Sequence, residues 1–335
     1  MRNAFCAAAA IAIGATALVG GSGSARAEVK ELKLGLQFGL IYLPATVAVE
    51  EKFMDKRAKE QGLPGLNVEI KRFSGSTAMN DAVISGNVDL GAYGLPGLLI
   101  VWDKTRGHQD VRGVAALGRN AFIVVSNKPA IKSLKDFTDD DRISLPATNS
   151  PQAILLKMAS DKLYGQPNHF DKMMVALPHP DSVTALLGGK EISGYVSTPP
   201  FQQFLLRDKR IHAVATAKEI LNGEEATGVI VGGAKKFVDD NPKVAKAVFL
   251  ALDDAMKFIR ENKPRCADIY IESEKSKLSK EDVVGMMSDG STEYDVAPHG
   301  LKRFADFMKK IGMMGQSPND WKEAFFPTAY DRSGS

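Results

Sequence analysis

Two loops rich in hydroxyl side chains are the parts of this sequence best suited to binding chemistry. They consist of Gly75, Ser76 and Thr77, and of Thr148, Asn149 and Ser150. The first loop lies between a predicted strand at 67–73 and a predicted helix at 78–84, and the second between a strand at 142–145 and a helix at 152–164. Backbone N–H groups are unpaired at a helix start, so such a loop offers N–H groups and hydroxyls to an anion. The first loop is therefore predicted to be half of a small-molecule site, and the second repeats its design.

Each of these side chains also has an explanation that needs no ligand. Ser76 and Thr77 are ordinary helix-capping residue types, and the segment 148–150 before a proline is a near-ideal helix start. Tyr93 follows a strand predicted at 88–92, where ligands bind, yet a packing tyrosine is equally typical of that position. The sequence alone leaves both interpretations open.

Residues for catalysis or metal binding are not grouped in the sequence. The histidines are scattered, no H-E-x-x-H motif occurs, and residues 73–76 do not form a G-x-S-x-G motif. Cys266 is the only cysteine after residue 27, so it has no partner for zinc or for an intramolecular disulfide. Arg119 lies in a predicted hairpin turn at 118–120, which favours a solvated arginine over an anion partner. We predict no catalytic residue, no metal and no cofactor.

The elements that would position the two loops alternate between strands and helices, which predicts an α/β fold. Further strands are expected at 31–38, 88–92, 111–117, 121–126, 173–177, 192–196 and 225–232, and further helices at 45–60, 95–102, 180–187, 197–206 and 242–261. The first strand–helix–strand unit predicts parallel pairing, and ligands bind beyond the carboxyl ends of such strands. The tail at 315–335, which is interrupted by glycines and prolines and contains several aromatic residues, is expected to pack against the body.

The first 27 residues predict a cleaved export signal. Arg2 precedes an almost wholly apolar run, and Ala25-Arg26-Ala27 supplies a small-residue cleavage site, so cleavage is expected after Ala27. The full 335 residues less these 27 leave 308, which is more than one core usually organises, so two lobes are expected. Loss of two arginines lowers the net charge from +3 to +1, which gives no reason to expect nucleic acid or an anionic membrane as a partner. No later segment approaches membrane-spanning length.

Six segments follow one another in a specific order. They are LGLQFGLIYLPATVAVEEKFM, FSGSTAMNDAVISGNVDLGAYG, IKSLKDF, LPATNSPQAILL, ALLGGKEISGYVSTPP and VGGAKKFVDDNP. Their order resembles the periplasmic solute-binding components of ABC importers, in the branch that includes nitrate, taurine and alkanesulfonate binders, and the likeness is best over residues 30–261. It implies a type II periplasmic-binding-protein fold, with two α/β lobes, two crossings and a ligand cleft between the lobes. Lobe 1 would comprise 28–127 plus 225–335, and lobe 2 would comprise 128–224.

The same resemblance implies a set of ligand contacts. They are Gln37, Phe38, Tyr42, Gly75, Ser76, Thr77 and Tyr93 in the first lobe, and Thr148, Asn149, Ser150, Ser197 and Thr198 in the second. Hydroxyls and helix-terminal N–H groups would hold a charged or polar headgroup, and the aromatic rings would enclose an apolar or planar body.

The function implied by the resemblance is that of a monomeric periplasmic receptor. It would capture a sulfonate-, taurine- or nitrate-like anion, or a related small organic molecule, and deliver it to a membrane permease with a cytoplasmic ATPase. An exported enzyme on the same fold and a sensory binding protein for a membrane receptor are the alternatives. A related enzyme branch uses clustered cysteines, and the lone Cys266 disfavours that activity here.

Overall fold

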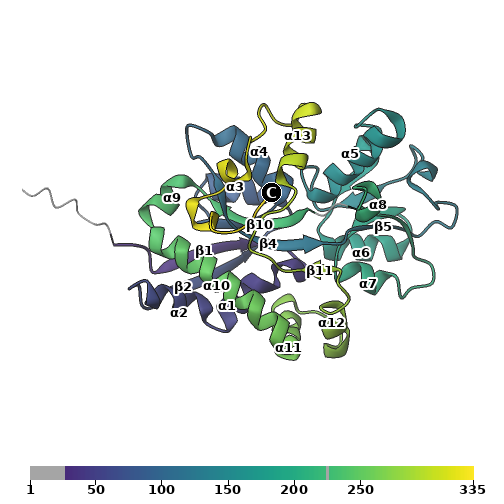
Figure 1. The fold of residues 1–335 in the computed structure, drawn as a ribbon. Helices are drawn as coiled ribbons and strands as arrows, with labels where there is room; N and C mark the ends of the chain where they lie inside the picture. The colour runs from purple at the N-terminus through teal and green to yellow at the C-terminus, as the bar shows by residue number, and fades with distance from the viewer. Residues whose placement is uncertain (1–26, 224–225) are drawn as a thin grey trace, which may run out of the picture.

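The computed structural model describes residues 27–223 and 226–335, which form two α/β lobes side by side (Figure 1). The predicted export signal therefore lies outside the described residues, apart from Ala27. Each lobe is built on one β-sheet, of six strands in the first and five in the second. The α/β fold and the two-lobe architecture predicted from the sequence are confirmed.

The six-stranded sheet of the first lobe has the strand order β11-β4-β10-β3-β1-β2. Its strands are β1 (Glu31–Leu36), β2 (Asn67–Arg72), β3 (Leu90–Gly94), β4 (Arg112–Asn120), β10 (Thr227–Gly233) and β11 (Thr292–Glu293). β1 pairs in parallel with β2 and β3, as the strand–helix–strand pattern predicted. β10 runs antiparallel to both β3 and β4. The helices of this lobe are α1 (Leu43–Glu50), α2 (Phe53–Glu60), α3 (Ser76–Ile84), α4 (Leu95–Thr105), α9 (Lys235–Asp240), α10 (Pro242–Glu261), α11 (Lys263–Glu274), α12 (Lys280–Met286) and α13 (Leu301–Lys310).

The five-stranded sheet of the second lobe has the order β7-β6-β8-β5-β9. Its strands are β5 (Ile123–Ser126), β6 (Ile143–Leu145), β7 (Met174–Ala176), β8 (Gly194–Ser197) and β9 (His212–Thr216). β6 is parallel to β7 and β8, and β5 is antiparallel to β8 and β9. The helices of this lobe are α5 (Pro151–Tyr164), α6 (His179–Gly188), α7 (Phe201–Leu205) and α8 (Ala217–Ile220). Short 3₁₀ turns occur at Leu40–Tyr42, Leu134–Asp136, Asp171–Met173, Trp321–Ala324 and Pro327–Ala329.

The chain crosses between the sheets twice, from β4 to β5 and from β9 to β10. The predicted hairpin around residues 118–120 is wrong, because β4 continues to Asn120 and β5 pairs in the other sheet. The first crossing thus lies at residues 121–122, ahead of the expected lobe boundary at 127. Gly118 has a φ of 129°, and a Cβ there would lie 1.9 Å from the carbonyl oxygen of Glu293, so only glycine lets β11 pass this close.

The single helix expected at 45–60 is two helices. Lys52 has a φ of 58°, in the left-handed region, and this residue separates α1 from α2. The tail packs against the body as predicted, because the Phe326 N–H donates to the carbonyl oxygen of Gly113 at 2.8 Å and the Phe325 ring covers that glycine.

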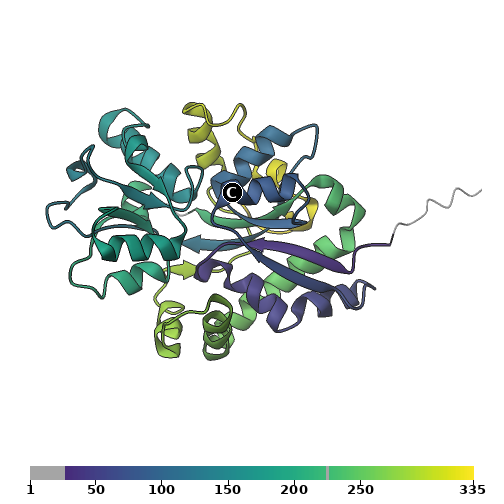
Figure 2. The ribbon, with the colours of Figure 1, turned by 180° about the vertical axis from the view of Figure 1, so that it is seen from behind.

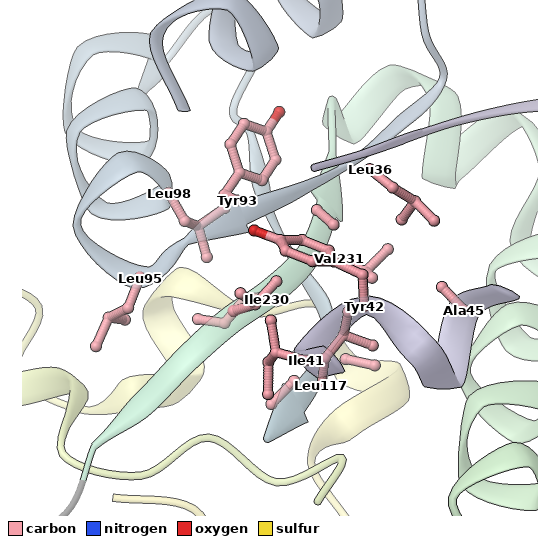
Figure 3. Packing of buried hydrophobic residues seen from close by; sticks show 14 of the residues in the cluster. Leu36, Ile41, Tyr42, Ala45, Tyr93, Leu95, Leu98, Leu117, Ile230 and Val231 are labelled. Atoms are coloured by element: carbon pink, nitrogen blue, oxygen red, sulfur yellow. The ribbon is translucent and has the colours of Figure 1, made fainter. Parts of the chain in front are cut away.

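The interior of the first lobe holds two tyrosines, Tyr42 from the 3₁₀ turn after β1 and Tyr93 from β3. Figure 3 shows Tyr42 and Tyr93 packed among aliphatic side chains near β3 and β10. Tyr93 is 0% exposed. Seen from behind, in Figure 2, the second lobe lies beside the end of the first-lobe sheet, and α12 and α13 lie at opposite edges of the boundary between the lobes. In open α/β sheets, ligands bind beyond the carboxyl ends of the strands. We therefore expect a site at the carboxyl ends of β1, β3, β6 and β8.

Candidate functional site

A cavity of about 20 Å³ lies between the two lobes, at the carboxyl ends of their parallel strands. It is lined by Gln37, Phe38, Ile41, Tyr42, Ser76, Gly94, Asn120, Phe122, Pro146, Ser150, Pro151, Gln152, His179, Thr198, Gly228 and Val229. Its volume is close to that of one water molecule, so the lobes must separate further to admit an organic solute. No Lys, Arg, Asp or Glu side chain is among these lining residues.

Gln37 and Phe38, which follow β1, form one side of the cavity. The Gln37 side-chain amide donates to the carbonyl oxygen of Ala92 at 3.2 Å, which fixes the amide against β3. Behind the cavity, Arg72 donates to the Gln37 carbonyl oxygen, and its guanidinium carbon lies 5.8 Å from the centre of the Phe38 ring. The loop after β1 is therefore held from outside the cavity by a cation that does not enter it.

The Arg72 guanidinium is paired with a buried acid on α11. Its Nη2 lies 2.6 Å from Oε1 of Glu274, whose side chain is 8% exposed. Burial raises the pKa of Glu274 to about 7, although Arg72 opposes the shift. Burial also raises the pKa of the nearby Tyr42 phenol. This cluster supports the cavity wall, and the Glu274 carboxylate partly neutralises the positive charge of Arg72.

Ser76 begins α3 at the edge of the cavity. Its Oγ accepts a hydrogen bond from the Gly94 N–H at 3.2 Å, so the hydroxyl joins the end of β3 to the start of α3. The N-cap of α3 is Gly75, and no side chain caps this helix. The capping role considered for Ser76 and Thr77 is therefore not what these hydroxyls do.

The second lobe contributes Ser150, Gln152 and His179. Ser150 is the N-cap of α5, and its Oγ accepts from the Ala153 N–H at 3.2 Å, as its sequence context predicted. His179, at the start of α6, forms a hydrogen bond through Nδ1 with the Tyr195 hydroxyl. Burial lowers the pKa of His179 to about 3, so its imidazole is neutral at physiological pH.

Four helices begin at this cavity: α3, α4, α5 and α6. The side chains or backbone of Ser76, Gly94, Ser150 and His179, which lie at or just before their first residues, all line it. Helix N-termini carry partial positive charge, worth roughly 0.3–1 kcal/mol each for an anion at low screening. The cavity therefore favours electron-rich groups without using a formal cation.

The lobes touch around the cavity. The Thr77 hydroxyl donates to Asn149 Oδ1 at 3.2 Å, and the Asn120 side-chain amide donates to Thr198 Oγ1 at 2.8 Å. The Leu40 N–H donates to the carbonyl oxygen of Pro199 at 3.2 Å. These are contacts between lobes, so they exist only while the lobes are closed.

Ion pairs join the lobes at both flanks of the boundary. Arg207, just after α7, forms a bidentate pair with Asp282 on α12, at 2.8 and 2.6 Å. On the other flank, Lys310 at the end of α13 lies 2.6 Å from Asp161 on α5. We call these two pairs the flank clasps. Both draw on the segment that follows the second crossing, so the C-terminal part of the chain holds the second lobe.

The predicted contacts fall into three groups in this structure. Those that line the cavity are Gln37, Phe38, Tyr42, Ser76, Ser150 and Thr198. Those that meet the opposite lobe beside it are Gly75, which faces the Pro146 carbonyl oxygen, and the pair Thr77 and Asn149. Those outside the lining are Tyr93 and Ser197, both fully buried, and Thr148, which is exposed.

Sequence reasoning missed Asn120, Phe122, Gln152 and His179 among the lining residues. Asn120 and Phe122 were assigned to a hairpin, whereas they border the first crossing. Gln152 and His179 each directly follow a predicted strand–loop segment, and that position was the signal that could have found them. Arg119, expected to be solvated, lies in β4 and forms an ion pair with Glu293 on β11.

Neither a metal centre nor a membrane span is found in the described part of the chain. Residues 27–223 and 226–335 contain no group of three or more His, Cys, Asp or Glu placed to hold a metal ion. No helix among them is long and apolar enough to cross a membrane. Cys266 is fully buried, and burial raises the pKa of its thiol to about 12, so it is not a reactive thiolate.

The model of the NMT1-like family matches residues 25–272. No curated protein has a significantly similar sequence. Among solved structures, the alkanesulfonate-binding protein SsuA from Xanthomonas axonopodis pv. citri, bound to MOPS, is similar with a TM-score of 0.69 and 15% identity, covering 87% of this chain and 96% of that chain.

Two further structures have the same fold. The periplasmic nitrate-binding protein NrtA from Synechocystis PCC 6803 has a TM-score of 0.67 and 17% identity, covering 89% of this chain and 84% of that one. A Candida albicans protein, described as having the generic periplasmic binding protein structural fold, has a TM-score of 0.66 and 12% identity over 88% of this chain and 96% of that one. At these identities the likeness establishes the fold.

Proposed function

Because the chain belongs to the NMT1-like family, we propose that it is the substrate-binding component of an ABC importer. It captures a small solute between its two lobes and delivers it to a membrane permease with a cytoplasmic ATPase. The observation that carries the proposal is the cavity lined from both lobes at the carboxyl ends of their strands. Closing such a cavity removes water from the solute and strengthens each polar contact.

The convergence of four helix N-termini supports an anionic or electron-rich solute. A sulfonate-, taurine- or nitrate-like anion, or a related small organic molecule, fits this environment. Relatives named for alkanesulfonate and nitrate binding share the fold, which is consistent with that class. The proposed solute contacts are the lining residues Gln37, Phe38, Tyr42, Ser76, Ser150 and Thr198.

The site of action proposed is the periplasm, with the export signal cleaved after Ala27. The contacts of Glu28 support this position, because its carboxylate accepts hydrogen bonds from the N–H groups of Lys243 and Val244 at the start of α10. A carboxylate at a helix start is stabilising, so the first residue of the mature chain is anchored. N-terminal sequencing of the exported protein is expected to begin at Glu28. In size-exclusion chromatography the protein is expected to elute as a monomer.

A thermal-shift screen against sulfonates, nitrate, carboxylates and heterocycles tests the proposal. A solute that binds only the folded state must raise the melting temperature. Ser76→Ala is expected to weaken binding of the hit, and Ser85→Ala, at the other end of α3, is the matched control because its Oγ bonds only within the helix, to Ala82. Failure of every class to shift the melting temperature would overturn the proposal.

Two further outcomes separate the proposal from its alternatives. A solute recovered chemically altered after incubation would identify an enzyme. Solute uptake that persists in a deletion strain, together with a lost transcriptional or chemotactic response, would identify a sensory binding protein.

A further inference from the structure

His179 is the only histidine that lines the cleft cavity within the described residues. Its side chain is 6% exposed, and it belongs to the wall made by the second lobe. Gln152, which is 3% exposed, lies beside it on α5. Polar side chains this deeply buried normally have hydrogen-bond partners that satisfy them, so the partners of this pair are informative.

The His179 ring is fixed on two sides. Its Nδ1 is bonded to the Tyr195 hydroxyl, and its face stacks on Phe201 with 5.4 Å between ring centres and 24° between planes. Tyr195 is itself fully buried on β8, so it cannot follow a moving imidazole. The ring is therefore preorganised, and only its Nε2 edge remains to interact with the cavity.

The Nε2 edge has a weak partner in this structure. Its neighbour is the side-chain nitrogen of Gln152, at 3.4 Å. That separation lies beyond the usual 2.7–3.2 Å range of roughly linear protein hydrogen bonds. A purely structural histidine would be better satisfied, since a buried polar group without a good partner is costly. The Nε2 edge and the Gln152 amide are thus placed to gain from a third group that enters between the lobes.

We propose that His179 and Gln152 form a recognition pair that hydrogen-bonds one uncharged polar group of the solute, such as a hydroxyl, an amide or a ring nitrogen. The proposal rests on the proposed function, since it assigns this wall of the same cleft to a second part of the bound solute. The helix N-termini receive the electron-rich end, and the recognition pair receives the uncharged group. Tyr195 is a positioning residue, because it orients His179 without lining the cavity.

The neutral state of the recognition pair explains why the group must be uncharged. The free Nε2 of a neutral imidazole offers one donor or one acceptor, depending on the tautomer, and an amide offers both kinds of group. Such a pair matches a hydroxyl or an amide, which also donates and accepts. The recognition pair offers no counter-ion to a second charge on the solute, and burying an unpaired charge is strongly unfavourable. A solute with two formal charges of the same sign is therefore excluded from this wall.

Matched solute pairs that differ by one uncharged group test the proposal. The probes are isethionate and ethanesulfonate, lactate and propionate, and nicotinamide and pyridine, each titrated calorimetrically into the purified full-length mature protein. Wild type is expected to bind the polar member of at least one pair about 3- to 10-fold more tightly, the range of a single neutral hydrogen bond. His179→Leu is expected to remove that preference, and His179→Gln to retain part of it.

Controls separate recognition from folding. His108→Leu changes an exposed histidine of the first lobe and must leave the preference intact. Tyr195→Phe removes the hydroxyl that orients the imidazole but keeps the ring, so an intermediate preference is expected. If His179→Leu fails to fold, as judged by its melting temperature without solute, Gln152→Leu replaces it with the same expected loss of preference.

Three results would overturn the proposal. A preference that persists in a folded His179→Leu or Gln152→Leu variant would show that another wall recognises the polar group. Equal binding of both members of every pair that binds would show that no such recognition exists, while leaving the proposed function in place. Absence of binding by all six probes and by every class in the thermal-shift screen would overturn the proposed function, and this inference with it.

Discussion

Gly75 and Gly94 lie where the two lobes meet, and we predict that alanine at either position keeps the lobes apart. A Cβ on Gly75 would lie 2.5 Å from the carbonyl oxygen of Pro146, and one on Gly94 would lie 2.5 Å from Cδ of Pro151. Both obstructing atoms belong to the second lobe. The backbone angles at both glycines, −178° and −179° at Gly75 and −60° and 142° at Gly94, are open to alanine. The largest part of the penalty therefore applies to the closed arrangement, although a Cβ on Gly94 would also lie 3.2 Å from the Ser76 Oγ of its own lobe.

The size of the effect follows from these distances. Ordinary contacts of a Cβ begin at 3.4 Å, so the opposing atoms must move apart by about 0.9 Å, the difference from 2.5 Å. Neither a backbone carbonyl nor a proline ring can move aside as a flexible side-chain end would. Overpacking of this kind costs about 1–3 kcal/mol, which lowers the population of the closed form about 5- to 150-fold. The apparent dissociation constant rises by at most the same factor, because a solute larger than the cavity of about 20 Å³ holds the lobes slightly further apart and relieves part of the clash.

The assay measures solute affinity by calorimetry and lobe separation by small-angle X-ray scattering. The solute is the strongest hit of the thermal-shift screen. The matched control is Gly188→Ala in the second lobe, because a Cβ there has nothing within 4 Å. Gly75→Ala and Gly94→Ala are expected to weaken binding and to keep the scattering curve of the open form, with melting temperatures without solute within the range of the control. Unchanged affinity in both variants would refute the steric reasoning.

Three further predictions concern the flank clasps, a buried acid and the cysteine. Arg207→Ala is expected to weaken solute binding by a small factor, about two- to fivefold, because its pair with Asp282 is solvent-exposed, and raising the ionic strength to about 1 M should abolish the difference. Glu274→Gln is expected to flatten the pH dependence of stability. Burial raises the pKa of Glu274 to about 7, above the 4.5 usual for an exposed glutamate, so wild-type stability falls as pH rises from about 4.5 to 7, by about 3 kcal/mol at most. Cys266 is expected to resist thiol reagents at pH 8 until the protein unfolds, because it is fully buried and its pKa is raised to about 12.

Each of these predictions has a control. Lys235→Ala removes an exposed ion pair within one helix, with Asp239, so it must leave solute affinity unchanged. Glu272→Gln changes an exposed acid two residues from Glu274, and melting curves at pH 5 and pH 8 should match those of wild type. A clasp effect that survives high salt, a pH slope retained in Glu274→Gln, or thiol labelling faster than unfolding would contradict the respective argument.

The hydrophobic pattern was sufficient to predict most elements of the fold, because buried residues recur along the sequence with different periods in strands and in helices. It failed where the outcome depended on distant partners. The same sequence pattern, a strand, a short turn and a second strand, is typical of a hairpin and also of a crossing between two sheets. Only the pairing of β4 with β10 and β11, more than 100 residues later in the chain, decides between the two. The helix break at Lys52 was missed for a local reason, because a lysine in the sequence gives no sign that its backbone adopts a left-handed conformation.

The candidate site was predictable to the level of loops but not of side chains. Strand ends and helix starts singled out Ser76 and Ser150, and both residues line the cavity. Neighbouring helical residues point about 100° apart, so Thr77 faces Asn149 of the other lobe instead. Tyr93 was expected at the cavity because it follows a predicted strand, yet it lies within β3 and its side chain is fully buried in the core.

We infer that Gly75, Thr77 and Asn149 of the hydroxyl-rich loops serve closure, whereas Ser76 and Ser150 of the same loops line the cavity. Thr77, Asn149 and Gly75 meet the opposite lobe without lining the cavity, so their contacts form with any solute that permits closure. A contact between the lobes that does not involve the solute changes only the population of the closed form. It therefore changes the affinity for every solute by the same factor. Discrimination between solutes requires groups whose interaction differs from one solute to the next. We propose that in this cleft those groups are the lining residues, His179 and Gln152 among them.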